Sequence, residues 1–164
     1  MSVLETARQF AIAAHGAQRY GDQPYILHLD AVARLAEPYG EEAVILAYLH
    51  DVLEDTPVTE AAIRQAFGDF VADCVAILTD EPGADRRERK FLTYAKMADI
   101  ENRLALALIV KVCDRLANVR ACVREGDRMR FERYRQEHPA FHTAVYRAGL
   151  CDDLWAELDR LLGV

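Results

Sequence analysis

The segment from residue 104 to residue 123 constrains the fold more than any other part of the chain. Leu104–Val110 is a run of seven apolar residues rich in Leu and Ala, and neither Gly nor Pro interrupts the segment before residue 124. Such residues favour helix over strand, and a helix that is apolar on every side must be surrounded by protein. The sequence therefore predicts a buried helix over about 102–123.

Helical spacing continues through nearly all of the chain. Ser2 and Glu5 form the pattern that caps a helix start, and this first helix is expected to stop before Gly16 or Gly21. Residues 43–53 are eleven residues without Gly or Pro, so we expect helix there rather than a buried strand. Further helices are expected at about 28–36, 41–53, 59–68, 69–78, 86–98, 128–137, 140–148 and 152–162.

The fold class that follows is an all-α, single-domain helical bundle. No turn dipeptide typical of a β-hairpin separates alternating segments, and we find no internal repeat. A length of 164 residues fits one domain, 1–164. The longest apolar runs are seven residues, whereas a membrane span needs about 20, so neither a membrane segment nor a membrane partner is expected. The first turn lacks the pattern of a secretory leader, so we expect a cytoplasmic location.

The four cysteines are scattered and form no C-x-x-C pair. Most of them fall on apolar helix faces, where a reduced thiol packs as a small hydrophobe. We therefore expect core thiols in a reducing compartment rather than disulfides.

The net charge of −7 argues against a nucleic-acid partner, but the charge is unevenly distributed. Residues 1–84 hold four Lys or Arg against fourteen Asp or Glu, while residues 85–164 hold sixteen against thirteen. An acidic half that faces a basic half suits a metal cation beside an anionic substrate. A solvated surface with ordinary salt bridges would give the same counts, so composition leaves both interpretations open.

The most informative cluster follows the apolar run 43–49. His50 and Asp51 come directly after it, with Glu54 and Asp55 one helical turn later. Four ionisable side chains beside buried residues are costly unless something compensates them. A divalent metal does so, because imidazole nitrogen and carboxylate oxygen are its ordinary ligands. Taken alone, the His-Asp pair favours an ordinary polar helix end, because the dipeptide is common by chance.

A second cluster lies on the predicted buried helix. Lys111, Asp114, Arg115 and Asn118 are three or four residues apart, so they form one polar stripe on an otherwise apolar rod. A buried carboxylate needs a partner charge or a metal, and a salt bridge from Asp114 to a neighbouring cation would also satisfy it.

A third feature is the segment 18–28, which we expect to be a loop that leads into the second helix and ends at His28. On its own this histidine reads as a helix cap.

Together, the order and spacing of these three features resemble the HD-domain metal-dependent phosphohydrolases. More closely, the chain resembles the hydrolase domain of the Rel/Spo-type (p)ppGpp hydrolases and their small stand-alone relatives. The matching stretches lie within residues 4–120 and are QR…PYILH (18–28), LHDVLEDT (49–56), FGDFV (67–71), TDE…ERK (79–90) and KVCDRLAN (111–118). The chain is expected to be too short for the synthetase and regulatory domains of the long enzymes.

The resemblance implies an HD fold that binds one divalent ion, most simply Mn²⁺, with Fe²⁺, Zn²⁺ or Ni²⁺ as other candidates. By motif position its ligands would be His28, His50, Asp51 and Asp114. Glu54 and Asp55 would position and deprotonate the attacking water. The residues expected to contact a small nucleotide substrate are Arg19, Tyr20, Arg87, Lys90, Lys111, Arg115, Asn118 and Tyr134.

Two departures from the family pattern affect the expected substrate. Tyr20 and Gly21 stand where the family usually has basic residues, and Leu29 stands where it usually has proline. We expect Arg19 and Tyr20 to stack on the base, with (p)ppGpp cleaved at its 3′-pyrophosphate. The alternatives are an HD phosphohydrolase for another nucleotide, such as the 2′-phosphate of NADPH or a nucleoside phosphate, and a non-enzymatic nucleotide-binding domain. A purely structural helical domain would not explain polar residues on two apolar helices.

Overall fold

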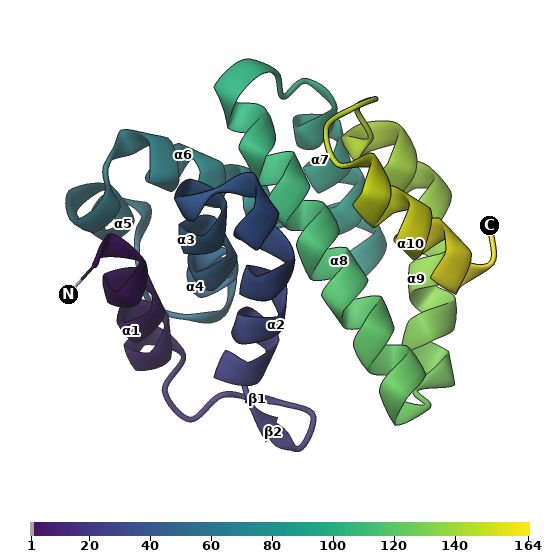
Figure 1. The fold of residues 1–164 in the computed structure, drawn as a ribbon, viewed down its shortest axis with the longest axis horizontal. Helices are drawn as coiled ribbons and strands as arrows, with labels where there is room; N and C mark the ends of the chain where they lie inside the picture. The colour runs from purple at the N-terminus through teal and green to yellow at the C-terminus, as the bar shows by residue number, and fades with distance from the viewer. Residues whose placement is uncertain (1) are drawn as a thin grey trace.

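Helix α8 (Leu106–Glu125) runs through the middle of the structure, with helices packed on both sides (Figure 1). The structure is a computed structural model, and it describes residues 2–164. The first group of helices is α1 (Val3–His15), α2 (Ile26–Ala36), α3 (Glu41–Leu49), α4 (Val52–Asp55), α5 (Glu60–Phe67) and α6 (Asp69–Leu78). The second group is α7 (Arg86–Ala98), α9 (Arg128–Val145) and α10 (Asp152–Leu162). The short 3-10 turns η1 (Glu37–Tyr39) and η2 (Asn102–Ala105) precede α3 and α8. The predicted all-α, single-domain fold is confirmed.

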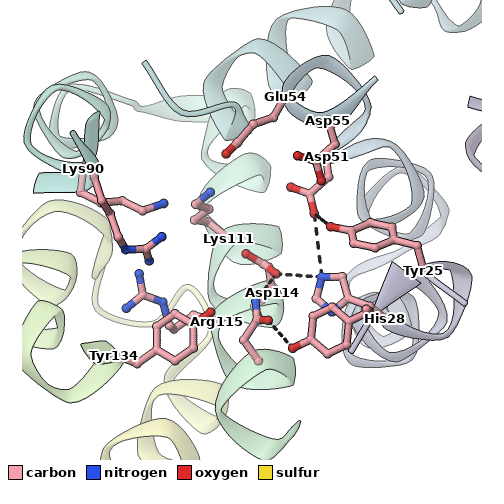
Figure 2. Close-up of a pocket in the computed structure, with 13 residues that line it drawn as sticks. Tyr25, His28, Asp51, Glu54, Asp55, Lys90, Lys111, Asp114, Arg115 and Tyr134 are labelled. Atoms are coloured by element: carbon pink, nitrogen blue, oxygen red, sulfur yellow. Dashed lines mark hydrogen bonds and ion pairs between the residues drawn. The ribbon is translucent and has the colours of Figure 1, made fainter. Parts of the chain in front are cut away.

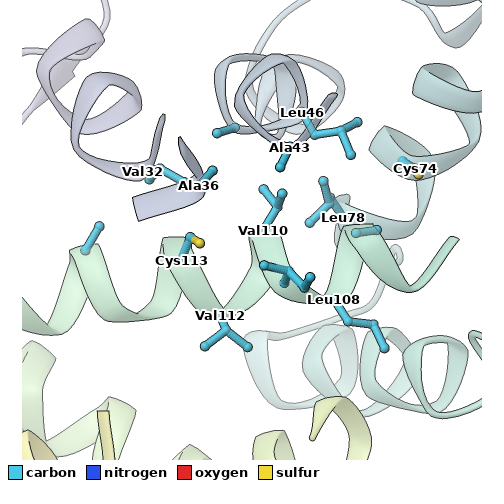
Figure 3. Close-up of a cluster of buried hydrophobic side chains, with 14 of the residues drawn as sticks. Val32, Ala36, Ala43, Leu46, Cys74, Leu78, Leu108, Val110, Val112 and Cys113 are labelled. Atoms are coloured by element: carbon cyan, nitrogen blue, oxygen red, sulfur yellow. The ribbon is translucent and has the colours of Figure 1, made fainter. Parts of the chain in front are cut away.

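The apolar residues of α8 meet neighbours on opposite sides of the helix. In Figure 3, Val110 points toward Ala43 and Leu46 of α3, while Val112 points away from them. Both valines are fully buried. The all-round apolar character of this segment thus reflects its central position. The polar side chains of Lys111 and Arg115, in the middle of α8, are therefore buried between the two groups of helices.

The hairpin formed by residues 19–24 corrects the expectation of a plain loop. Strands β1 (Arg19–Tyr20) and β2 (Gln23–Pro24) pair antiparallel, and the turn places Gly21 at φ +57°. Glycine adopts this left-handed conformation at little cost. Strands of two residues have no periodicity to detect, which explains why the sequence pattern missed the hairpin.

Two expected helices have different limits in the structure. The expected helix 41–53 is interrupted after α3, and Asp51 has φ −105° and ψ −1° at the break. The interruption brings the side chains of His50 and Asp51 together, with Nε2 and Oδ2 2.9 Å apart.

The expected break between 137 and 140 is wrong, because α9 continues through Pro139. Proline removes one helical hydrogen bond, but Pro139 lies on the exposed face, where solvent reaches the freed carbonyl. The buried side chains of Phe141, Ala144 and Val145 anchor the second half of the helix.

The four cysteines are buried free thiols, as expected. Within residues 2–164, every helix is too short or too polar to span a membrane.

Candidate active site

A pocket lies against α8 and receives side chains from both groups of helices (Figure 2). Its lining residues are Tyr20, Tyr25, His28, Asp51, Glu54, Asp55, Arg86, Lys90, Lys111, Asp114, Arg115, Asn118 and Tyr134. Most of the residues singled out from the sequence are in this set. Three of them are not in it: Arg19, Arg87 and His50, which is fully buried beside Asp51 and Asp114.

One wall of the pocket is a cluster of imidazole and carboxylate groups from three segments. His28 lies in α2, His50 and Asp51 lie at the α3–α4 break, and Asp114 lies on α8. The Nε2 atoms of His28 and His50 lie 3.2 and 3.5 Å from Oδ1 of Asp114. Ligand atoms of His28, His50 and Asp51 all lie within 4.8 Å of one another. This spacing allows one metal ion to contact several of them.

His50 is held in the tautomer that a metal ligand needs. Its Nδ1 lies 2.7 Å from the carbonyl oxygen of Ala47, which can only accept a hydrogen bond, so Nδ1 carries the proton. Nε2 is buried and has no hydrogen-bond partner among the described residues. In neutral His50, the Nε2 lone pair faces the carboxylates of Asp51 and Asp114. A cation between them would remove the repulsion between this lone pair and the two carboxylates, so this donor set fits a divalent metal.

The electrostatics of the cluster agree with a site built for positive charge. Burial opposes ionisation of Asp51 and Asp114, but attraction to the nearby histidines outweighs it and lowers the pKa of both carboxyls. Burial likewise opposes a charged His50, yet Asp51 and Asp114 raise its pKa well above the ordinary value. Both carboxylates are therefore ionised at neutral pH.

Glu54 and Asp55 lie at one end of the pocket, on α4 (Figure 2). The Glu54 carboxylate accepts the backbone N–H of Asp80 at 3.2 Å, and the Asp55 carboxylate accepts from the Gln18 amide at 2.8 Å. Desolvation by the pocket and repulsion from Asp80 raise the pKa of Glu54, with Lys111 opposing them. A carboxylate with a raised pKa beside a metal site suits proton transfer.

The opposite wall is cationic. Lys90, Lys111 and Arg115 extend from α7 and α8 toward the pocket in Figure 2, and Arg86 is a further lining residue. Lys111 is buried and donates to the carbonyl of Leu78 at 2.9 Å. Burial lowers its pKa, but Asp114 and other nearby carboxylates outweigh this and raise the pKa of Lys111. This lysine therefore stays charged.

The Arg115 side chain is buried, and one of its guanidinium nitrogens makes no hydrogen bond to the described residues. Nη2 donates to the Tyr94 hydroxyl at 2.9 Å and lies 3.2 Å from the Glu137 carboxylate, but Nη1 has no hydrogen-bond partner among the described residues. Its guanidinium lies 4.7 Å from the centroid of the Tyr134 ring. Because Arg115 also lines the pocket, its guanidinium adds positive charge to this wall.

The structure differs from the expected base sandwich between Arg19 and Tyr20. Arg19 donates to the carbonyl of Asp22 within its own hairpin. The Tyr20 ring stacks on His28 with centroids 4.7 Å apart and planes 2° apart, and its hydroxyl donates to Asn118 at 2.6 Å. Tyr20 therefore contacts the cluster that includes His28 and Asp114.

Arg86, rather than Arg87, reaches the pocket because it lies on the face of α7 that carries Lys90. Arg86 and Lys90 are four residues apart and share a face, whereas Arg87 is rotated by about 100° and is exposed. The four-residue spacing to Lys90 on the expected helix 86–98 is the signal that could have identified Arg86.

Sequence reasoning also missed three residues that hold the lining side chains. Tyr25 donates to Asp51 at 2.5 Å. Asp80 contacts Lys90 at 2.6 Å. Glu137 contacts both Arg86 and Arg115. No local pattern pairs these residues with partners far along the chain.

Comparison with known proteins places this fold and pocket in a family. The HD domain family matches residues 7–141. The chain belongs to the HD domain family. A second comparison supports the architecture of this HD domain: a solved structure described as a metazoan ortholog of SpoT that hydrolyses ppGpp has a TM-score of 0.84 at 24% identity. That match covers 99% of this chain and 95% of the other. A Listeria monocytogenes structure has a TM-score of 0.67 at 25% identity, covering 85% of this chain and 98% of the other.

Several curated relatives of this HD domain share one enzyme name, and others are named GTP pyrophosphokinase. A Danio rerio protein named guanosine-3′,5′-bis(diphosphate) 3′-pyrophosphohydrolase MESH1 is 35% identical over 136 residues, covering 76% of this chain and 72% of the relative. An Aquifex aeolicus protein named guanosine-3′,5′-bis(diphosphate) 3′-pyrophosphohydrolase is 34% identical over 120 residues. That alignment covers 71% of this chain but only 17% of the relative's length.

Proposed function

We propose that this HD domain is a metal-dependent phosphohydrolase that cleaves the 3′-pyrophosphate of (p)ppGpp, giving GDP or GTP and pyrophosphate. The observation that carries the proposal is the two-sided pocket, with a His/Asp cluster on one wall and cationic side chains on the other. A polyphosphate needs both a cation at the reacting group and positive charge around its remaining oxygens. The names of the Danio rerio and Aquifex aeolicus relatives favour (p)ppGpp as the substrate.

The proposed ligands of the ion are His28, His50, Asp51 and Asp114. Two imidazoles and two carboxylates form a mixed nitrogen and oxygen set, which suits Mn²⁺ or Fe²⁺ and tolerates Zn²⁺ or Ni²⁺. A bound divalent ion would act as a Lewis acid on the phosphoryl group and would lower the pKa of water.

The acidic pair on α4 is proposed to handle the proton of the attacking water. Glu54 lies on the pocket side, and its raised pKa brings it closer to neutrality, where a general base works best. The Asp55 carboxylate is held by Gln18 and orients the same water. Hydrolysis then proceeds by direct attack on phosphorus, and no covalent enzyme intermediate is needed.

The other lining residues are proposed to bind the nucleotide. Lys90, Lys111, Arg86 and Arg115 supply positive charge to the phosphates. Tyr134 offers an aromatic surface and a hydroxyl for the nucleoside, beside Asn118. The proposed substrate contacts therefore include Arg86 and leave out Arg19 and Arg87.

The test is a substrate panel with the purified protein loaded with Mn²⁺. ppGpp, pppGpp, NADPH and nucleoside monophosphates are incubated separately, and released pyrophosphate and phosphate are measured by ion chromatography. The expected result is pyrophosphate and GDP from ppGpp, abolished by a chelator and restored by Mn²⁺. Release of phosphate from NADPH without hydrolysis of ppGpp would support a phosphohydrolase but would refute (p)ppGpp as its substrate. Turnover of no nucleotide, together with nucleotide binding, would indicate a binding domain instead.

A further inference from the structure

The hairpin side chain Tyr20 stacks on one proposed metal ligand, His28, and is linked to a second, Asp114, through a hydrogen bond to Asn118. We propose that Tyr20 is a positioning residue of the metal site, fixing the ring plane of His28 and, through Asn118, the carboxylate of Asp114. This inference rests on the proposed metal site and adds a residue from outside the ligand set.

The first contact is the ring stack on His28. The two centroids are 4.7 Å apart and the planes differ by 2°, so the rings lie face to face. His50 has its ring fixed by the bond from Nδ1 to Ala47, but no bond between Nδ1 of His28 and any described residue does the same. A metal ligand must present its lone pair in one direction, and such orientation commonly comes from the residues around it. For His28, stacking by Tyr20 supplies this orientation.

The second contact passes through Asn118 to Asp114. The Asn118 amide donates to Oδ1 of Asp114 at 2.7 Å and to the Asp114 carbonyl at 3.0 Å. A carboxylate only accepts, so the Nδ2 side of the amide must face Asp114 and the Oδ1 side must face away. Tyr20 donates its hydroxyl to that Oδ1 at 2.6 Å. The phenol therefore selects the amide orientation that holds the carboxylate.

Tyr20 itself is held in place from the second group of helices. The Arg130 guanidinium on α9 lies 5.0 Å from the Tyr20 ring centroid, and its Nε donates to Cys122 at 3.1 Å. Burial raises the pKa of Tyr20, so its hydroxyl stays protonated and donates at neutral pH. The hairpin is thus tied to α2, α8 and α9 by one side chain.

Metal affinity tests the inference without relying on turnover. Mn²⁺ binding to the apoprotein is measured by isothermal titration calorimetry for wild type, Tyr20→Phe, Tyr20→Leu and the control Tyr39→Phe. Tyr39 donates to Asp153 outside the pocket, so its variant loses one hydroxyl bond of the same kind. We expect Tyr20→Phe to weaken binding by roughly fivefold, as for one lost hydrogen bond. Tyr20→Leu, which also loses the stack, should weaken it by about 10- to 100-fold, and Tyr39→Phe should leave it unchanged.

The visible spectrum of the Co²⁺-loaded protein supplies a readout that general destabilisation does not move. Tyr20→Leu should shift the ligand-field bands, because it alters ligand geometry, while Tyr39→Phe should not. Wild-type affinity and spectrum in both Tyr20 variants would overturn the inference and leave the proposed function standing. Unchanged metal binding with a raised KM would also overturn it, making Tyr20 a substrate contact. Absence of metal binding by the wild type would refute the proposed function itself. Should Tyr20→Leu fail to fold, Tyr20→Phe still decides the hydroxyl contact.

Discussion

The carboxylate of Glu54 accepts a hydrogen bond from the backbone N–H of Asp80, 26 residues further along the chain, at 3.2 Å. This contact ties α4 to the segment after α6, where the Asp80 side chain also binds Lys90. The segment that contains Asp80 therefore positions both Glu54, the proposed base, and Lys90 of the cationic wall. Repulsion between the Asp80 and Glu54 carboxylates contributes to the raised pKa of Glu54.

Replacing Glu54 by Gln should keep the metal and lower kcat by roughly 10²- to 10⁴-fold, the usual contribution of a general base. The base works ionised, so wild-type activity should fall as the pH drops through the raised pKa of Glu54, above its ordinary value of 4.5. The residual activity of the Gln variant should not show this fall at low pH. Glu42→Gln, at an exposed residue paired with Arg103, is the control. Near-normal turnover by Glu54→Gln would remove Glu54 from the mechanism.

Replacing Asp114 by Asn should abolish stabilisation by Mn²⁺. A ligand that binds only the folded state adds about 2.7 kcal/mol at a hundred times its Kd, so wild-type Tm should rise as Mn²⁺ is added. The variant keeps the size of the side chain but loses the charge that faces both histidines. Differential scanning fluorimetry with increasing Mn²⁺ checks this, with Asp153→Asn as a control outside the pocket. Equal shifts in wild type and Asp114→Asn would exclude Asp114 as a ligand.

Much of the helical arrangement was predictable, because it depends on patterns within single segments. The apolar character of α8 indicated its burial, and Ser2 caps α1 by accepting from the Glu5 N–H at 3.1 Å. His50, Asp51 and Asp114 stood out for a related reason: they are costly groups within apolar surroundings.

The remainder depends on contacts that local patterns do not contain. Tyr20 meets Asn118 across 98 residues, and Arg86 meets Glu137 across 51. The choice between Arg86 and Arg87 depended on which face of α7 meets the pocket, and a shift of one residue turns a side chain by about 100°. Pro139 was misread because its cost in a helix depends on whether solvent reaches the freed carbonyl.

Arg86 and Arg87 give a matched pair for testing the cationic wall. Arg86→Ala should raise KM for the nucleotide by about 10- to 100-fold, the equivalent of a lost charged hydrogen bond. Arg87→Ala should change KM by less than about twofold, because an exposed charge outside the pocket is screened by solvent. Steady-state kinetics at one ionic strength measure both. Equal effects of the two substitutions would mean that long-range charge, rather than contact, attracts the substrate.

Glu137 should stabilise the fold in a pH-dependent manner, because it is held between Arg86 and Arg115. Burial raises its pKa, but the two arginines outweigh this and hold the pKa of Glu137 below its ordinary value of 4.5. The folded state therefore binds fewer protons than the unfolded state. Its contribution is complete above about pH 4.5 and is lost as the pH falls through the folded-state pKa.

Glu137→Gln should accordingly cost about 1.5–3 kcal/mol at pH 7, the value of hydrogen bonds to charged groups. For a domain of this size the loss corresponds to a Tm decrease of roughly 3–10 °C. The gap from wild type should close as the pH falls below 4.5, since protonated Glu resembles Gln. Glu157→Gln is the control, because Glu157 forms a more exposed pair with Arg120 and should cost less than about 1 kcal/mol. A gap that stays constant or widens toward low pH would show that the Glu137 charge does not stabilise the fold, leaving Arg115 to be held by its packing on Tyr134 and Phe141.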